Sequence, residues 1–531
     1  MKRLGARWEM CWLLFLTRGV CQANRVLLGA LMPYLSEEVR MSSQEKGSIL
    51  AAFSTGYMLT QVIGGAASDA FGGKILTSIA ITSMSLGSLV AAPLLKAGGL
   101  HLFWFCYFFM GLAEGPSYPT TGSIMSKWVP AHERGAALSI VDTGSSVASM
   151  VTFAVAPLLA ARYGWRFAFH CFGSVSFAIC ALWMHFSANR PAESVRVSPE
   201  ERALLVQGGV PPEDVLSEDV AQSDVVVALL NGQDDAPPNE SPLMTPSAAS
   251  ETSQKLKENG GTSSASSSNG GTASSNGHHL LKKTTPTPTS AKVFSYDDVT
   301  AKKVKKRKKA QGFPFRLFCF SGAWAVVLAH AAFNFGRYFV YNSIVSFYVD
   351  VAGVSPVTAG TQVLFGQIAD TLGKFLFAGA VDRAIQRDAS KKTRVRKIVS
   401  STAFVVFALS MLTMAHTTSV AAITCALIIA KIASSAHVCG FKTTYLDLSS
   451  KHTGSLTGVS NTLATLSAMI SPLATGYFLG RHNTADGAAN PGWRHMFFLI
   501  VVVNLLAALV WALFASADSL DDKIATSKGA A

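Results

Sequence analysis

The sequence is poor in charged residues for its length. Only 15% of its 531 residues are Asp, Glu, Lys or Arg, whereas 49% are hydrophobic and the mean hydropathy is +0.32. Soluble proteins of this length carry about 25% charged residues, so the composition argues against a soluble class. The clearest apolar run, Met496 to Phe514, is about as long as a helix that crosses ~30 Å of hydrocarbon.

Motifs of catalysis are also missing from the sequence. There is no Ser/His/Asp arrangement, no P-loop and no metal-ligand spacing, and none of the eight cysteines falls in a Cys-x-x-Cys pair. The sequence therefore predicts no enzyme, no cofactor and no metal site. The cysteines are interpreted as reduced packing residues.

Apolar runs define twelve expected membrane spans and an all-α integral membrane fold. The first six lie near 10–35, 46–69, 74–95, 101–127, 134–160 and 165–187, and the second six near 316–349, 356–382, 397–416, 418–446, 453–480 and 494–515. Two six-helix bundles, 10–187 and 316–516, are therefore expected on either side of a long loop. The layout is typical of transporters built from parallel repeats.

The connecting segment, 188–315, has a different composition. It contains the run NGGTSSASSSNGGTASSNG and ends in the basic block KKVKKRKK, Lys302 to Lys309. We expect a disordered loop. The basic block is interpreted either as a charge cluster that sets topology or as a clamp for anionic lipids.

Basic residues predict the orientation and argue against a nucleic-acid partner. The net charge is +13, but Lys and Arg concentrate in short segments between apolar runs, as in cytoplasmic loops. Both termini and the central loop are therefore expected to be cytoplasmic, although Arg162 and Arg166 would then lie outside. The sequence does not specify the membrane.

A short repeat follows the second and the eighth spans. GGAASDAFGGK (64–74) and AGAVDRAIQR (378–387) each place an Asp at the end of a span, followed by basic residues. The first copy resembles the loop motif of the major facilitator superfamily at Asp69 and Lys74, and the second copy keeps Asp382 and Arg383. The resemblance implies a gating or conformational role for these four residues.

Two longer stretches resemble solute carrier family 17, the anion transporters that include vesicular glutamate transporters, sialin and plant plastid phosphate carriers. These stretches are GLAEGPSYPTTGSIMSKWVPAHERG (111–135) and FKTTYLDLSSKHTGSLTGVSNTLATLSAMISPLATGY (441–477). The resemblance covers most of both bundles and excludes the central loop. It implies secondary active transport by alternating access.

Arginines inside the spans are the first candidates for substrate binding. A charge at mid-bilayer costs about 2.5–3.5 kcal/mol on insertion scales, so it indicates function by default. Arg25 and Arg337 lie in the first and seventh spans, which are equivalent in a parallel repeat, and the resemblance implies anion contact for both. Their forked guanidinium groups suit carboxylate or phosphate. Arg18 lies nearer the cytoplasmic end and is a weaker candidate.

Glu114, in the fourth span, is the candidate coupling residue. The resemblance implies a role in coupling, and a semi-buried carboxylate can carry a proton near neutral pH. The alternative is a permanent salt bridge to an arginine, and the two roles do not exclude each other. The family's usual arginine and histidine are absent at Tyr107 and Leu50, which weakens glutamate as the substrate.

Other polar residues complete the predicted cavity. Asp142, Lys431 and His437 have no evident family counterparts. Lys431 and His437 lie about 120° apart on a helix, so they cannot share one narrow face. Either of them could line the cavity, and the alternative is a buried pair with a neighbouring helix. Tyr57 and Asn461 are expected to offer neutral hydrogen bonds. Asp370 and Lys374, at i and i+4, are expected to form an intrahelical pair.

These features predict a monomeric secondary transporter for phosphate or an organic anion, coupled to H⁺ or Na⁺ and embedded in lipid. Phosphate is favoured because two opposed arginines suit a compact anion with several oxygens. An organophosphate exchanger of the same superfamily and a non-transporting membrane receptor remain as alternatives.

Overall fold

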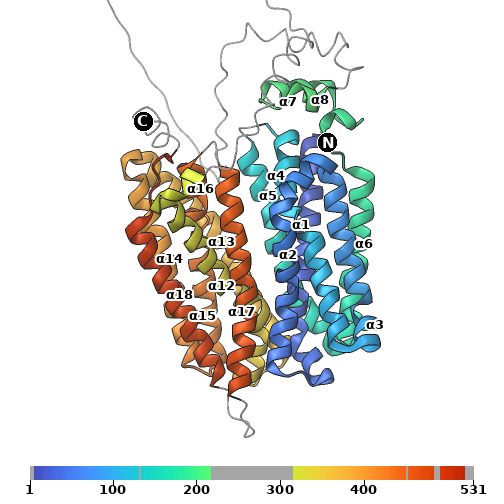
Figure 1. The fold of residues 1–531 in the computed structure, drawn as a ribbon, viewed down its shortest axis with the longest axis vertical. Coiled ribbons are helices and arrows are strands. Elements are labelled where there is room, and N and C mark those ends of the chain that lie inside the picture. Colours follow the sequence, from blue (N-terminus) through green and yellow to red (C-terminus); the bar gives the residue numbers. More distant parts are fainter. Residues whose placement is uncertain (1–4, 131–132, 217–314, 450–452, 483–490, 521–531) are drawn as a thin grey trace, which may run out of the picture.

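A computed structural model describes residues 5–130, 133–216, 315–449, 453–482 and 491–520. These residues form helices joined by short connections, and no β-strand occurs among them. Figure 1 shows two elongated bundles side by side, one formed by α1–α6 and the other by α12–α18. The predicted all-α fold with two bundles is confirmed.

The N-terminal bundle holds the first six spans in α1 (Ala6–Val39), α2 (Ser43–Phe71), α3 (Gly73–Glu114), α4 (Ser117–Trp128), α5 (Arg134–Tyr163) and α6 (Trp165–Phe186). α3 contains two spans, because the backbone leaves the helical conformation at Gly98 and Gly99. Gly99 has φ +62°, which residues with a side chain rarely adopt. The second half of α3 continues into α4 after a break at Gly115–Pro116.

The C-terminal bundle holds the other six spans in α12 (Ser321–Ala352), α13 (Pro356–Arg387), α14 (Lys392–Ala415), α15 (Val420–Ala436) with α16 (Phe441–Leu448), α17 (Thr453–Arg481) and α18 (Gly492–Phe514). The short helices η2 (Phe315–Cys319) and η3 (Ala389–Lys391) precede α12 and α14. The tenth span is interrupted between α15 and α16, as the fourth is between α3 and α4. The two interruptions occupy equivalent places in the repeat, and all twelve predicted spans are helical.

Four long helices, α1, α2, α12 and α13, fall outside the set of strongly apolar spans. Seven segments of the described residues are long and apolar enough to cross a membrane, and one of them, Gly73–Trp128, contains two spans. α1 and α12, which carry Arg18, Arg25 and Arg337, are not among the seven. These two helices contact each other at the interface between the bundles, where a charge is kept away from lipid.

The bundles meet mainly along three helix pairs, α1 with α12, α2 with α17, and α5 with α13, with a smaller contact between α1 and α13. Glycines bring the backbones together. A Cβ atom at Gly29 would overlap the carbonyl oxygen of Tyr341, one at Gly47 would overlap that of Pro472, and one at Gly360 would overlap that of Phe153. These contacts close the bundles against each other toward the end of the molecule opposite α7 and α8 (Figure 1).

Part of the predicted disordered loop is ordered, which corrects that expectation. Residues 191–216 form η1 (Pro191–Glu193), α7 (Pro199–Gln207) and α8 (Pro212–Val215) at one end of the N-terminal bundle. Glu201 accepts hydrogen bonds from the backbone N–H groups of Ala6 (2.8 Å) and Arg7 (3.0 Å), at the positive end of the α1 dipole. Leu205 and Val215 are fully buried. Residues 217–314 lie outside the described part of the chain.

We expect Gly29→Ala to impair closure of the two bundles. Overpacking a close contact costs about 1–3 kcal/mol, and here the added methyl group meets a backbone oxygen that cannot rotate away. Uptake into proteoliposomes should fall, because the closed state becomes less populated. Gly122→Ala is the matched control, since nothing lies within 4 Å of a Cβ atom there. Equal uptake by the two variants would contradict the close contact.

Candidate functional site

Arg25 and Glu114 form a buried ion pair inside the N-terminal bundle. Nη2 of Arg25, in α1, lies 2.6 Å from Oε2 of Glu114, at the end of α3, and Glu114 is only 1% exposed. Phe53 and Tyr57 of α2 lie against the guanidinium, with ring centroids 4.9 and 5.0 Å from Cζ. The salt bridge expected as the alternative role of Glu114 is therefore present.

Arg25 also reaches across to the other bundle. Its Nη1 donates a hydrogen bond of 3.0 Å to the hydroxyl of Tyr338 in α12. Tyr338 in turn packs edge-on against Tyr341, with ring centroids 6.1 Å apart. A single guanidinium thus contacts a buried carboxylate of one bundle and a phenol of the other.

Arg337, the second predicted arginine, has a different environment. Its Nε and Nη2 donate to the hydroxyl of Tyr341 at 3.1 and 3.0 Å, and no carboxylate of the described residues lies within salt-bridge distance of it. The rings of Phe333 and Tyr341 lie 5.7 and 5.1 Å from its Cζ. The structure therefore places Arg25 and Arg337 on the facing helices α1 and α12, one neutralised by a carboxylate and the other hydrogen-bonded to a phenol.

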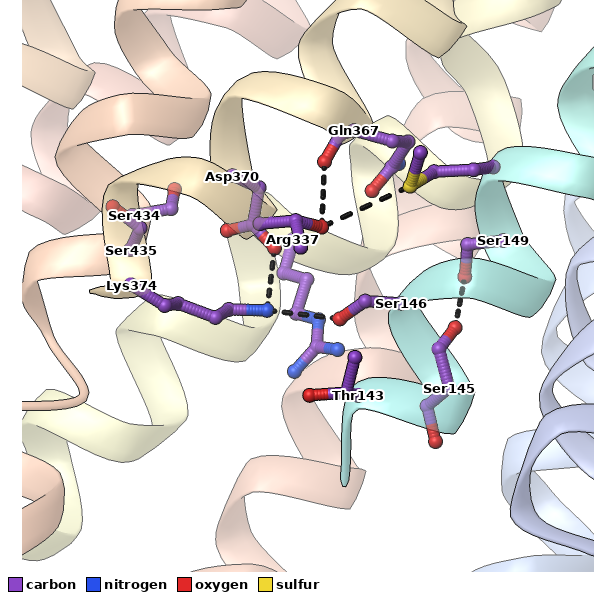
Figure 2. Close-up of polar contacts among 12 residues, drawn as sticks. Thr143, Ser145, Ser146, Ser149, Arg337, Gln367, Asp370, Lys374, Ser434 and Ser435 are labelled. Atoms are coloured by element: carbon purple, nitrogen blue, oxygen red, sulfur yellow. Dashed lines mark hydrogen bonds and ion pairs between the residues drawn. The ribbon is translucent and has the colours of Figure 1, made fainter. Parts of the chain in front are cut away.

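A second ion pair lies beside Arg337 in the C-terminal bundle (Figure 2). Nζ of Lys374 is 2.6 Å from Oδ2 of Asp370, one turn earlier in α13, and 3.0 Å from the hydroxyl of Ser146 in α5. The predicted intrahelical pair is confirmed, and it also joins the two bundles through Ser146. Lys431 of α15 lies with its Nζ 4.8 Å from the ring of Tyr341.

The remaining predicted residues occupy different surroundings. Tyr57 is buried under Arg25 and stacks on Phe53. Arg18 lies over the ring of Tyr118 at 5.6 Å, and Asp142 is exposed. Asn461 is half-buried in α17, and its backbone oxygen accepts from Thr465 (2.8 Å), whose hydroxyl also bonds Gln61 of α2 (3.1 Å).

His437 is separated from the arginines by packing. It is 2% exposed, and its ring lies 4.2 Å from the Phe404 ring and 5.2 Å from the Phe441 ring. Its Nδ1 is 3.4 Å from the hydroxyl of Ser400. Of the two titratable residues expected near this position, Lys431 faces Tyr341 and His437 belongs to an aromatic cluster.

The residues of the repeated loop motif are only partly described. Nζ of Lys74 donates to the carbonyl oxygen of Ser187 at the end of α6 (2.8 Å), and Arg383 is exposed. The side chains of Asp69 and Asp382 lie outside the described residues. Lys74 therefore ties α3 to α6 within one bundle.

Three residues that the structure brings to the arginines were not selected from the sequence: Tyr338 and Tyr341 offered neutral hydrogen bonds without being placed in the cavity, and Lys442 was missed. Tyr338 and Tyr341 follow Arg337 by one and four residues, and Lys442 of α16 lies with its Nζ 4.5 Å from the Phe333 ring. The i,i+4 spacing of Arg337 and Tyr341 was an available signal. Tyr338 and Lys442 gave none, because their partners lie on other helices.

Comparison with known proteins agrees with this architecture. A family model described as Major Facilitator Superfamily matches residues 14–472. The chain belongs to the major facilitator superfamily. It is therefore a multi-pass membrane protein of a transporter family and not an enzyme.

Relatives within the superfamily are anion transporters by name. The chain is 24% identical to "Ascorbate transporter, chloroplastic" of Arabidopsis thaliana, covering 97% of this chain and 76% of the relative. It is 22% identical to "Sodium-dependent phosphate transport protein 1, chloroplastic" of the same plant, covering 97% and 80%. Among solved structures, an inward-facing, occupied bacterial homologue of the human lysosomal transporter Spinster matches with a TM-score of 0.60, 12% identity and 96% coverage of both chains.

We expect Tyr341→Phe to weaken anion binding. The variant removes the hydroxyl that accepts both hydrogen bonds of Arg337, and a hydrogen bond to a charged group is worth about 1.5–3 kcal/mol. The freed guanidinium loses its orientation, so the KM for anion uptake should rise roughly tenfold or more.

Tyr477→Phe is the matched control for this test. Tyr477 also accepts a hydrogen bond from an arginine four residues away, Arg481, but the pair is exposed near the end of α17. Its loss should leave KM unchanged. An unchanged KM in Tyr341→Phe would show that the hydroxyl does not hold Arg337 for the substrate.

Proposed function

We propose that the chain moves phosphate or a small organic anion across a membrane by alternating access, with Arg25 and Arg337 as the substrate-binding residues. The observation that carries this proposal is the placement of two arginines on facing helices of the two bundles, with Arg337 free of any described carboxylate within salt-bridge distance. A half-buried guanidinium between the bundles that lacks a counter-ion is suited to binding an anion. The names of the relatives, an ascorbate and a phosphate transporter, support an anionic substrate.

Protonation of Glu114 supplies the coupling in this proposal. While Glu114 is ionised, it neutralises Arg25 at 2.6 Å. A proton on the carboxylate weakens that pair and frees Arg25 for the anion, so proton and anion are bound together. H⁺ is favoured over Na⁺ because a carboxylate already neutralised by an arginine is a poor ligand for a metal cation.

Rocking of the bundles then exposes the site to either side. The glycine contacts at Gly29, Gly47 and Gly360 close the end opposite α7 and α8. In this proposal the anion enters this conformation from the end that carries α7 and α8. With both termini and the central loop in the cytoplasm, as the basic residues favour, it is the inward-facing state. Because the two bundles of one chain enclose the site, a monomer is sufficient for transport. Tyr57, Asn461 and Arg18 complete the cavity wall.

Arg25→Ala and Arg337→Ala should each abolish uptake of the transported anion. Each variant removes one of the two cations that face the cavity, while the helices keep their apolar contacts. The assay is uptake of radiolabelled phosphate, ascorbate and glutamate into proteoliposomes, with imposed H⁺ or Na⁺ gradients. Arg166→Ala is the control, because this arginine is exposed and pairs with Glu38 at the molecular surface.

Normal uptake by either cavity variant would refute the site assignment. Strict exchange of phosphate without any cation gradient would favour an organophosphate exchanger instead. If wild-type protein moves no anion under any gradient, transport itself is the wrong function.

A further inference from the structure

Positive charge is unevenly divided between the two bundles. In the N-terminal bundle Arg25 is neutralised by Glu114. In the C-terminal bundle no described carboxylate lies within salt-bridge distance of Arg337, Lys431 or Lys442, whereas Lys374 pairs with Asp370. Arg18 of α1 also lacks a described carboxylate within salt-bridge distance and lies over the Tyr118 ring, but it is a single cation, whereas α12, α15 and α16 bring three together.

These three cations gather around two neighbouring rings of α12. The Tyr341 ring centroid is 5.1 Å from Cζ of Arg337 and 4.8 Å from Nζ of Lys431. The Phe333 ring centroid is 5.7 Å from Cζ of Arg337 and 4.5 Å from Nζ of Lys442. Each ring thus contacts both Arg337 and one lysine, and the three positive charges form one cluster.

The rings do not compensate this charge. Lys431 is 5% exposed, and a cation–π contact recovers only part of the hydration that a buried ammonium loses. Among the described residues, Asp370 attracts Lys374, Lys431 and Arg337, but it is already paired with Lys374 (Figure 2). Asp142 of α5, in the other bundle, attracts Lys442 only at longer range than an ion pair. More negative charge is needed than the described side chains supply.

We propose that Lys431 and Lys442 form, with Arg337, a subsite for a second negative charge, and that the transported anion is therefore divalent. HPO₄²⁻ and a dicarboxylate share this chemistry. The inference rests on the proposed anion transport and refines its substrate class. A monovalent anion would satisfy Arg337 and leave the lysines uncompensated.

Matched ligand pairs that differ in charge test the subsite. The full-length protein, purified in detergent at pH 7.5, is titrated with phosphate and with hypophosphite, and with glucarate and with gluconate, and binding is followed as thermal stabilisation. The divalent member of a pair should bind at least about tenfold more tightly than the monovalent one. Lys431→Gln and Lys442→Gln should each raise the Kd of the divalent ligand about tenfold and that of the monovalent ligand less than about twofold.

Further variants separate charge from folding. Lys431→Arg should keep the preference for the divalent ligand, and Lys96→Gln, at an exposed position of α3, should change neither Kd. Melting without ligand reports whether each variant is folded. Lys431→Met removes the same charge without a polar group and should reproduce Lys431→Gln.

Three results would overturn the inference. The first is equal affinity of the wild type for the divalent and the monovalent ligand of both pairs. The second is an equal loss of affinity for the divalent and the monovalent ligand in the lysine variants, and the third is no binding of any of the four anions. Equally fast uptake of monovalent and divalent anions would refute the proposed subsite but would still agree with anion transport. Absence of all anion uptake would instead refute the proposed function itself.

Discussion

A charge held inside a membrane must be compensated, and the ion pair between Arg25 and Glu114 meets this need within the N-terminal bundle. Glu114 is almost fully buried and its carboxylate lies 2.6 Å from the guanidinium. The same arginine donates to Tyr338 across the interface between the bundles. Any change in the protonation of Glu114 therefore alters both the charge of the site and a contact between the two moving bodies.

The two bundles contribute differently to the proposed cycle. The N-terminal bundle holds Arg25, whose positive charge is neutralised by Glu114. The C-terminal bundle holds Arg337, Lys431 and Lys442 around two aromatic rings, without a described carboxylate in salt-bridge distance. In this account the cations of the C-terminal bundle attract the anion at all times. Arg25 of the N-terminal bundle binds the anion only when Glu114 is protonated. That order makes transport of the anion dependent on the proton.

Patterns within short stretches of the sequence predicted the structural features that depend on residues close together in the chain. The twelve spans follow from apolar runs, and the Asp370–Lys374 pair follows from an i,i+4 interval. The arginines could be found because a charge is rare in such helices. Tyr338 and Lys442 could not, because their partners lie on helices brought together only by packing. The docked segment 191–216 was predicted as disordered because its few apolar residues, such as Leu205, have no local partner; they are buried only against the folded bundle.

The most direct test of the central claim is the number of protons taken up when the anion binds. The purified protein is titrated with glucarate, whose two carboxylates stay ionised near neutral pH, in buffers of different ionisation enthalpy. The dependence of the binding heat on the buffer gives the number of protons that the protein takes up. The account predicts uptake of about one proton by the wild type near neutral pH and none by Glu114→Gln, which should still bind the anion. Anion binding without proton uptake in the wild type, or unchanged uptake in Glu114→Gln, would contradict it.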